Sequence, residues 1–195
     1  MRQWVCRILM MSLAASVLFA GCAAKQGAPG KPAAAKLALR VNAGATEAYT
    51  DKAGNVWQPE KAYQKGGGFG FVEGLTVDRG ADVKIADTND PRIFQTEHYS
   101  MTGFVAEVPN GKYTVRLHFA ETYPEIATDG PRVFDVTIQG KSVLPGLDVS
   151  KAAGAVQKAL VKEFKGIEVA DGTLKIEFAA KQQNSEINGI EIIAE

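Results

Sequence analysis

The sequence predicts an all-β fold, an antiparallel sandwich or jelly roll. From Leu37 onward, apolar and polar residues mostly alternate, which is the period of a strand with one buried face. Gly and Asn residues, which accept the positive φ of tight hairpins, separate the alternating segments. Only residues 149–162 have a helical composition. Short strands joined by such turns are typical of antiparallel sandwiches, whereas a βαβ fold places a helix after each strand.

The alternating segments predict the strands in order along the chain. The segment 113–119 is the clearest, because four large apolar side chains share one face and His118 falls on the other. Turns are predicted at Pro109-Asn-Gly111, Gln139-Gly140 and Asp171-Gly172. The six clearest strands are predicted at residues 37–41, 104–108, 113–119, 134–138, 174–178 and 190–192.

One segment is predicted to be partly helical. Ser150 is suited to cap a helix within residues 149–162, but Gly154 interrupts it. We therefore expect a short helix that leads into a strand near residues 160–169, and at most one or two short helices in the whole fold. Residues 37–195 show no internal repeat, so they are predicted to form a single domain.

Residues 1–21 are predicted to be a lipoprotein signal peptide. Arg2 and Arg7 precede an apolar run at residues 8–20, which is shorter than the ~20 residues that span a bilayer. The segment Phe19-Ala-Gly-Cys22 resembles a bacterial lipobox, in which the Cys after the cleavage point receives lipid. We expect lipidation of Cys22, palmitate included, because stable anchoring needs more than one acyl chain. The alternative is a plain secretory signal with Cys22 as an accidental neighbour.

Residues 22–36 are predicted to be the lipidated Cys and a flexible tether. Residues 23–36 are rich in Ala, Gly, Pro and Lys and contain no large apolar residue. Ala23 is not acidic, so the chain lacks the signal that retains some lipoproteins at the inner membrane. The expected location is the cell envelope, with a lipid anchor at the outer membrane that faces the periplasm or the cell surface.

Charge and cysteine content exclude several kinds of function. The 195 residues contain 22 Lys and Arg against 22 Asp and Glu, without a long basic run. A nucleic-acid partner is not expected, because non-specific binding requires a basic surface. The five basic residues before Leu37 have no acidic counterpart there, which leaves 17 basic and 22 acidic residues in 37–195, a net charge of −5. Residues 23–195 contain no Cys, which excludes disulfides and thiolate metal sites within them.

The glycine-rich segment 66–71 contains two candidate binding residues, Phe69 and Phe71. No Lys-Ser or Lys-Thr follows it, so a phosphate-binding loop is not predicted. Glycines let a loop pass close to a ligand with both phenylalanines standing out from it; the alternative is a turn whose phenylalanines pack inward. His98 and His118 are the two histidines and have no carboxylates at a recognisable spacing, so neither a metal nor a cofactor is predicted.

Glu97 and Glu121 are the acids best placed for chemistry, each at the end of an apolar segment. A glycosidase needs two carboxylates on either side of the bond that it cleaves. The alternative is that each accepts amide hydrogen bonds or pairs with an arginine such as Arg132. We favour the alternative and predict no enzyme activity, because no nucleophile elbow, catalytic triad or other signature accompanies the two acids.

Aromatic residues in predicted turns suggest a binding surface. Tyr99 and Tyr123 lie between strands, as do the two phenylalanines of the glycine-rich segment. A pyranose ring exposes an apolar C–H face and polar edges, so aromatic planes backed by carboxylate or amide groups suit it.

Several segments carry a family resemblance. They are Arg40-Val-Asn-Ala-Gly44, Gly68-Phe-Gly-Phe71, Phe94-Gln-Thr-Glu-His-Tyr99, Phe119-Ala-Glu-Thr-Tyr123, Arg132-Val-Phe-Asp-Val136, Asp171-Gly-Thr-Leu174 and Ile187-Asn-Gly-Ile-Glu-Ile192. In this order the sequence resembles the malectin family over essentially all of residues 37–195. The pair of Gln-Thr-Glu-x-Tyr and Phe-Ala-Glu-x-Tyr is the most specific part.

The resemblance implies a jelly-roll, galactose-binding-like β-sandwich that binds carbohydrate, typically glucose-containing oligosaccharides, without catalysis. The family's binding aromatics fall on Phe69 or Phe71, on Tyr99 and on Tyr123, and its acid before the last strand falls near Gln183 or Asn184. Three departures follow: Phe replaces a Tyr, Pro124 replaces a Phe, and an amide replaces a carboxylate. Each removes a polar group or a stacking face.

The expected function is non-catalytic binding of a glucose-containing oligo- or polysaccharide by a lipid-anchored, malectin-like domain at residues 37–195. The expected partners are a glucan or another cell-envelope glycan, and the membrane through the lipid. The alternative is a structural or protein-interaction lipoprotein domain that has lost sugar binding. The predicted carbohydrate-binding residues are Phe69, Phe71, Glu97, Tyr99, Tyr123 and Asn184.

Overall fold

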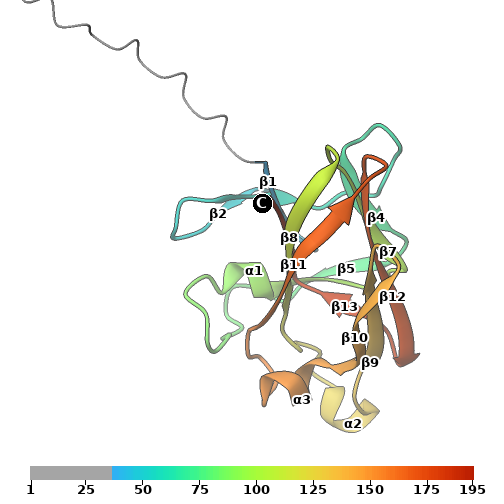
Figure 1. Ribbon diagram of the computed structural model, residues 1–195. Coiled ribbons are helices and arrows are strands. Elements are labelled where there is room, and N and C mark those ends of the chain that lie inside the picture. The colour runs from blue at the N-terminus through green and yellow to red at the C-terminus, as the bar shows by residue number, and fades with distance from the viewer. Residues whose placement is uncertain (1–36) are drawn as a thin grey trace, which may run out of the picture. The chain divides into compact units, whose positions relative to one another are not determined.

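A computed structural model describes residues 37–195, which form an all-β sandwich as the alternation predicted (Figure 1). The predicted signal peptide, Cys22 and the tether lie outside the described residues. The larger sheet has the strand order β11 (Leu160–Val169), β8 (Gly111–Phe119), β14 (Gly189–Ala194), β1 (Ala38–Asn42), β3 (Val56–Pro59) and β2 (Tyr49–Thr50).

Two further sheets complete the fold. The five-stranded sheet has the order β10 (Lys141–Asp148), β9 (Val133–Ile138), β12 (Thr173–Gln182), β7 (Gly103–Glu107) and β4 (Phe69–Val72). The small sheet has the order β13 (Glu186–Ile187), β6 (Thr96–Tyr99) and β5 (Leu75–Asp78). Nearly all the pairings are antiparallel, and β1 with β3 is a parallel pair.

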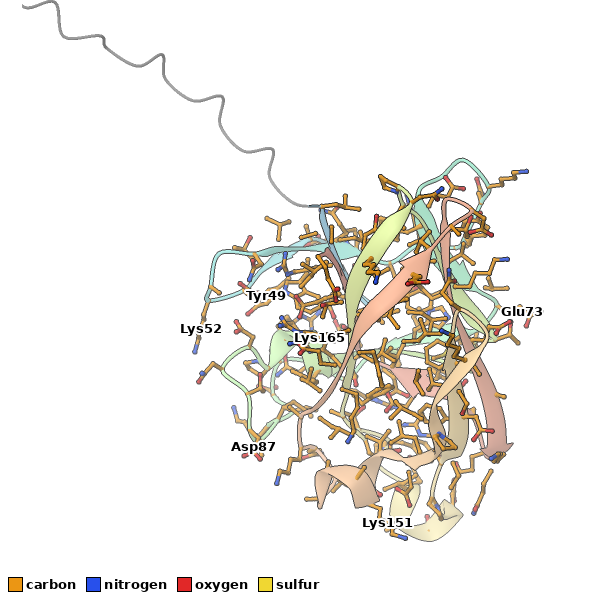
Figure 2. The ribbon with its side chains drawn as sticks, in the orientation of Figure 1. Tyr49, Lys52, Glu73, Asp87, Lys151 and Lys165 are labelled. Carbon is orange, nitrogen blue, oxygen red and sulfur yellow. The ribbon has the colours of Figure 1, made fainter. Side chains whose placement is uncertain are left out.

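The hydrophobic core lies between the two large sheets. The predicted alternation of β8 buries one face: Val115, Leu117 and Phe119 are 0% exposed. Buried residues of β9 and β12 supply the facing layer, so the periodicity of separate segments converges on one core. Figure 2 shows side chains filling this interior, while the labelled Lys52 and Lys151 lie at the periphery.

The structure contains three helices among the described residues, each of four or five residues, where the sequence predicts one or two. The predicted helix is α3 (Val149–Ala153), which ends where Gly154 adopts a left-handed φ of 84°. It leads into β11 at Leu160, as predicted. The helices α1 (Arg92–Gln95) and α2 (Ile126–Asp129) are single turns without a side-chain cap, too short to show helical periodicity in the sequence. In Figure 1, α2 and α3 lie together at the lower end of the sandwich.

Asn188 ties the small sheet to the larger one. Its buried side-chain amide donates to the carbonyls of Phe94 and Thr96 at 3.2 and 2.8 Å, and its oxygen accepts from the backbone N–H of Ala120 at 2.5 Å. These bonds fix the start of β6 against the segment that follows β8. Both segments contribute side chains to the cavity described below.

Candidate functional site

A cavity of about 300 Å³ lies where the small sheet meets four loops. The loops are those that follow β5, that follow β8, that precede β9 and that join β12 to β13. Its lining combines two aromatic rings with charged and amide side chains: Val77, Arg79, Glu97, Tyr99, Tyr123, Arg132, Gln183 and Asn184.

The alternation of β6 divides its side chains between the cavity and the interior. Glu97 and Tyr99 line the cavity. His98 points the other way: its Nδ1 lies 2.7 Å from Glu60 Oε2, its Nε2 lies 2.9 Å from the carbonyl of Glu73, and its ring stacks on Phe71 at a centroid distance of 4.2 Å. These contacts hold β6 and so set the direction in which Glu97 and Tyr99 project.

Arg132 is the hub of the buried charges beneath the cavity. Its guanidinium donates to Glu121 through Nε at 2.9 Å and Nη2 at 2.5 Å, and its Nη1 donates to Glu97 at 2.5 Å. Burial alone lowers the pKa of Arg132, but the hydrogen bonds to Glu121 and the charges of Glu97 and Glu121 raise it above its usual range. Arg132 is therefore a permanent cation that holds two carboxylates in place.

Glu186 lies in the same cluster without a hydrogen-bond partner. It is 0% exposed, and neither carboxylate oxygen bonds any atom of the described residues. Burial raises the pKa of Glu186 well above its usual range, and the charge of Glu97 adds to the shift, while Arg132 opposes it. Glu186 therefore takes up a proton more readily than an ordinary glutamate.

Tyr123 and Arg79 form the outer part of the cavity. The Tyr123 hydroxyl donates to Asp129 Oδ2 at 2.7 Å, and this bond together with burial raises the pKa of the hydroxyl. The Arg79 guanidinium lies 6.0 Å from the centre of the Tyr123 ring and donates to Glu97 at 3.2 Å and to Thr122 at 3.3 Å. Tyr99 and Tyr123 are both half-buried, so each keeps part of its surface exposed.

The structure gathers four of the six predicted binding residues around one cavity. Glu97, Tyr99, Tyr123 and Asn184 all line it, although Glu97 is 0% exposed and its oxygens are taken by Arg132, Arg79 and Thr122. Glu97 thus holds the arginines in place and presents no free oxygen to the cavity.

Phe69 and Phe71 do not belong to this group, and their expected place in an open loop is wrong. They lie on strand β4, where Phe71 is 2% exposed and packs on His98 and Phe104. Phe69 packs against the core and lies under the Lys61 ammonium at 4.4 Å. A Cβ at Gly70 would lie 2.5 Å from the backbone nitrogen of Tyr63, so this glycine allows the close approach of a neighbouring segment.

Two other lining residues, Val77 and Arg79, were not predicted from the sequence. They belong to the end of β5 and the loop after it, a strand too short and too exposed to alternate clearly. Val77 pairs with Glu97 across the small sheet, so it is this strand pairing that brings it to the cavity. Arg132, which the sequence offered as a partner for Glu97 and Glu121, does pair with both.

A second hollow of about 410 Å³ lies on the outer face of the larger sheet. Its floor carries an ion-pair ladder across three strands, in which Glu191 of β14 lies between Arg40 of β1 and Arg116 of β8. Trp57, its largest aromatic residue, is 2% exposed, so the hollow offers no tryptophan face. Asp87, labelled in Figure 2, lies on its rim. The cavity with two half-exposed tyrosines is the better candidate for ligand binding.

Comparisons with known proteins agree with the resemblance of the sequence. The malectin domain family matches residues 37–193. A probable LRR receptor-like serine/threonine-protein kinase of Arabidopsis thaliana is 38% identical over 84 residues, 40% of this chain and 8% of that protein. Receptor-like protein 4 of the same plant is 38% identical over 85 residues, 43% of this chain. The chain therefore matches only 8% and 13% of the length of these two proteins.

Solved structures share the fold. A β-glucuronidase of Bacteroides uniformis is 26% identical with a TM-score of 0.73, over 82% of this chain and 18% of the enzyme. The extracellular domain of ANXUR1 from Arabidopsis thaliana is 16% identical with a TM-score of 0.63, over 80% of this chain and 47% of that one. At this identity the plant structure shows the fold alone. Since the family match covers nearly the whole sandwich, the chain belongs to the malectin domain family.

Proposed function

We propose that residues 37–195 bind carbohydrate without catalysis, at the cavity between Tyr99 and Tyr123. One observation carries the proposal: in a member of the malectin domain family, two half-exposed tyrosines from different elements line one cavity with amide and guanidinium groups. Aromatic faces suit the C–H face of a sugar ring, and fixed polar groups suit its hydroxyls.

The ring stereochemistry that we propose is that of glucose, in an oligo- or polysaccharide. The family membership supports this choice. The similarity to part of a β-glucuronidase also supports it, because a domain of this shape is found in a protein named for the cleavage of glucuronides.

The arrangement of the acids supports a binding role without catalysis. Glu97 and Glu121 both hydrogen bond to Arg132, and each has every oxygen occupied. A general acid must carry a proton and a nucleophile must reach the sugar, whereas these two carboxylates are held as ion pairs.

The test of the proposed function is a glycan array probed with the full chain, followed by calorimetric titration of the glycans that bind. Binding of glucans or related cell-envelope glycans supports the proposal. If no sugar binds at about millimolar concentration, where a binding free energy is only about −4 kcal/mol, the proposal is rejected.

Protein binding is the second candidate function. Leu75 on the edge strand β5 is 60% exposed and pairs with Tyr99, so an apolar side chain stands beside the cavity. A related fold, the receptor-like kinase FER, has been solved in complex with the peptide RALF23 and LLG2. This alternative predicts an empty glycan array, and weaker binding of a protein partner when Leu75 is replaced by Asp.

We also propose that Cys22 carries a lipid and anchors the chain in the cell envelope, at the outer membrane that faces the periplasm or the cell surface. Within residues 37–195, no helix is long and apolar enough to cross a membrane. Replacement of Cys22 by Ala should move the protein from the detergent phase to the aqueous phase in a detergent partition experiment. Retention in the detergent phase would contradict the anchor.

A further inference from the structure

The carboxylates around the cavity have little capacity left to accept hydrogen bonds. Every oxygen of Glu97 and Glu121 accepts at least one bond, and Arg132 donates three of the six. Asp129 at the outer side accepts from the Tyr123 hydroxyl and from a neighbouring threonine. A ligand that offers mainly hydroxyl donors therefore finds few free acceptors among the acids of this cavity.

Free donors are more abundant at the same cavity. Within the described residues, Arg79 Nη1 and Asn184 Nδ2 have no protein acceptor, and the Tyr99 hydroxyl, which can donate or accept, makes no hydrogen bond. The side-chain amide of Gln183 donates to the carbonyls of Asp129 and Gly130, which leaves its oxygen as an acceptor. The balance favours a ligand with strong acceptors, a carboxylate above all.

Arg79 is placed where its guanidinium can donate to a ligand carboxylate. Its side chain is 19% exposed, whereas that of Arg132 is 3% exposed, so Arg79 is the cation within reach of a ligand. Its bonds to Glu97 and Thr122, at 3.2 and 3.3 Å, are longer than the bonds that hold Arg132. A carboxylate can therefore approach the free edge of its guanidinium without first breaking a short ion pair.

The cluster beneath the cavity adds little negative charge to oppose such a ligand. Arg79 and Arg132 balance Glu97 and Glu121. The raised pKa of Glu186 favours its neutral form, which leaves Asp129 and Glu125, both near the Tyr123 hydroxyl, as carboxylates that would repel an anion. Both are exposed to solvent, where water and salt weaken the repulsion.

We propose that the cavity selects an acidic sugar of the glucuronic acid type, with the sugar carboxylate on Arg79 Nη1 and Asn184 Nδ2. This inference rests on the proposed function and specifies its ligand class. Glucuronic acid keeps the ring of glucose and differs at C6, where a carboxylate replaces the hydroxymethyl group. The tyrosines contact the ring in both cases, and Arg79 distinguishes the two sugars.

The test compares methyl glucuronide with methyl glucoside, in both anomeric forms, by titration of the full chain followed by NMR. We expect a dissociation constant for the glucuronide that is lower by about tenfold or more, the effect of one hydrogen bond between charged groups. Arg79→Gln should weaken glucuronide binding to the level of the glucoside, and Arg79→Lys should keep part of the preference. The preference should also decrease at high salt.

Arg92→Gln is the matched control. Arg92 pairs with Asp78, one residue before Arg79, and does not line the cavity. Arg92→Gln should keep the preference for the glucuronide. Equal or tighter binding of the glucoside, or an Arg79→Gln variant that keeps the preference, overturns the inference and leaves carbohydrate binding standing. If neither methyl glycoside binds and the glycan array is empty, the proposed function fails and the inference fails with it.

Discussion

Glu186 shows at the scale of one residue how burial changes the chemistry of a side chain. The carboxyl group is fully buried beside Glu97 and has no hydrogen-bond partner in the described residues. The ionised form would be an unsolvated charge next to another carboxylate, so the folded protein favours the protonated form. Folding therefore takes up a proton at Glu186 above the ordinary pKa of a glutamate.

This uptake makes the stability of the fold depend on pH. The pKa of Glu186 is higher in the folded chain than the usual 4.5, so protonation of Glu186 adds to the free energy of unfolding. This stabilisation is fully present below about pH 4.5 and is lost as the pH rises through the folded pKa. Glu186→Gln should remove this loss, so the variant should gain stability relative to the parent as the pH rises. Urea unfolding of both proteins between about pH 5 and about pH 8 measures the difference.

Glu163→Gln serves as the control for the pH experiment. Glu163 pairs with Arg116 on the outer face, and this hydrogen bond lowers the pKa of its carboxyl. That variant should keep the loss of stability with rising pH that Glu186 causes. Identical pH profiles for the parent and Glu186→Gln would show that the buried carboxyl is ionised in the folded protein.

The sequence predicted the two tyrosines of the cavity lining but not Arg79, and the reason lies in what each residue type indicates by itself. Tyr99 and Tyr123 were predicted because they stand in specific motifs, but the expected turn position of Tyr99 is wrong, since it is the last residue of strand β6. Arg79 was not found, since an arginine after a short exposed strand looks like any surface cation. Its importance depends on the pairing of β5 with β6, which sequence periodicity does not reveal.

The strands of the sandwich were predictable where they bury one face along several residues. The predicted segment 113–119 lies within β8, Gly111–Phe119, and the predicted segment 134–138 lies within β9, Val133–Ile138. Strand β10 was missed, because Pro145 and Gly146 interrupt its pattern and its pairing with β9 contains register shifts. Alternation therefore predicts β11 and β12 despite one register shift in each, and misses β10, where Pro and Gly break the pattern as well.

In the glycine-rich segment 66–71, the sequence predicted an open loop where the structure has strand β4. Its glycines suggested an open loop, but Gly70 is needed where the backbone of residues 62–63 approaches β4. Phe71 consequently points into the core. A glycine in a sequence indicates that space is tight or that φ is positive. The same glycine is expected whether a ligand or another segment of backbone causes the crowding.

Gly44 is expected to be essential for the position of β6. It has a φ of 79°, and a Cβ there would lie 2.5 Å from the carbonyl oxygen of Glu97. Gly44→Ala should cost about 2 kcal/mol or more, because it adds a steric clash to about 1–2 kcal/mol of left-handed strain. Gly54→Ala, at a φ of 84° with open space around the Cβ, should cost only the strain. Chemical denaturation measures both, and equal losses would contradict the account of β6.

At the scale of the whole molecule, one core joins the two large sheets. Phe104 of β7 is 0% exposed and belongs to the same core cluster as Phe119 of β8, whose ring centre lies 6.2 Å from that of Phe134 on β9 in the facing sheet. Phe104→Ala should destabilise the fold by about 3–5 kcal/mol, in a single unfolding transition. Val161→Ala, at a side chain that is 46% exposed, should change stability by only about 0.5 kcal/mol. Two separate transitions would show that the sheets unfold independently.

The sandwich also limits where a ligand can bind. Its interior is filled, and the hollow on its outer face has Trp57 almost fully covered. The cavity at the small sheet combines half-exposed aromatic rings with a fixed polar cluster. The fold thus holds its binding groups on the small sheet and on the loops beside it, Tyr99 on β6 and Tyr123 after β8 among them.

Titration of Tyr99→Ala with a glycan that binds the parent tests the central claim most directly, with Phe69→Ala as the matched aromatic control. Tyr99 lines the cavity, whereas Phe69 packs against the core on β4. We predict that Tyr99→Ala weakens binding by about tenfold or more, the effect of losing one stacked ring, and that folded Phe69→Ala binds like the parent. Unchanged binding by Tyr99→Ala, or a loss confined to Phe69→Ala, would contradict the assignment of the cavity as the carbohydrate site.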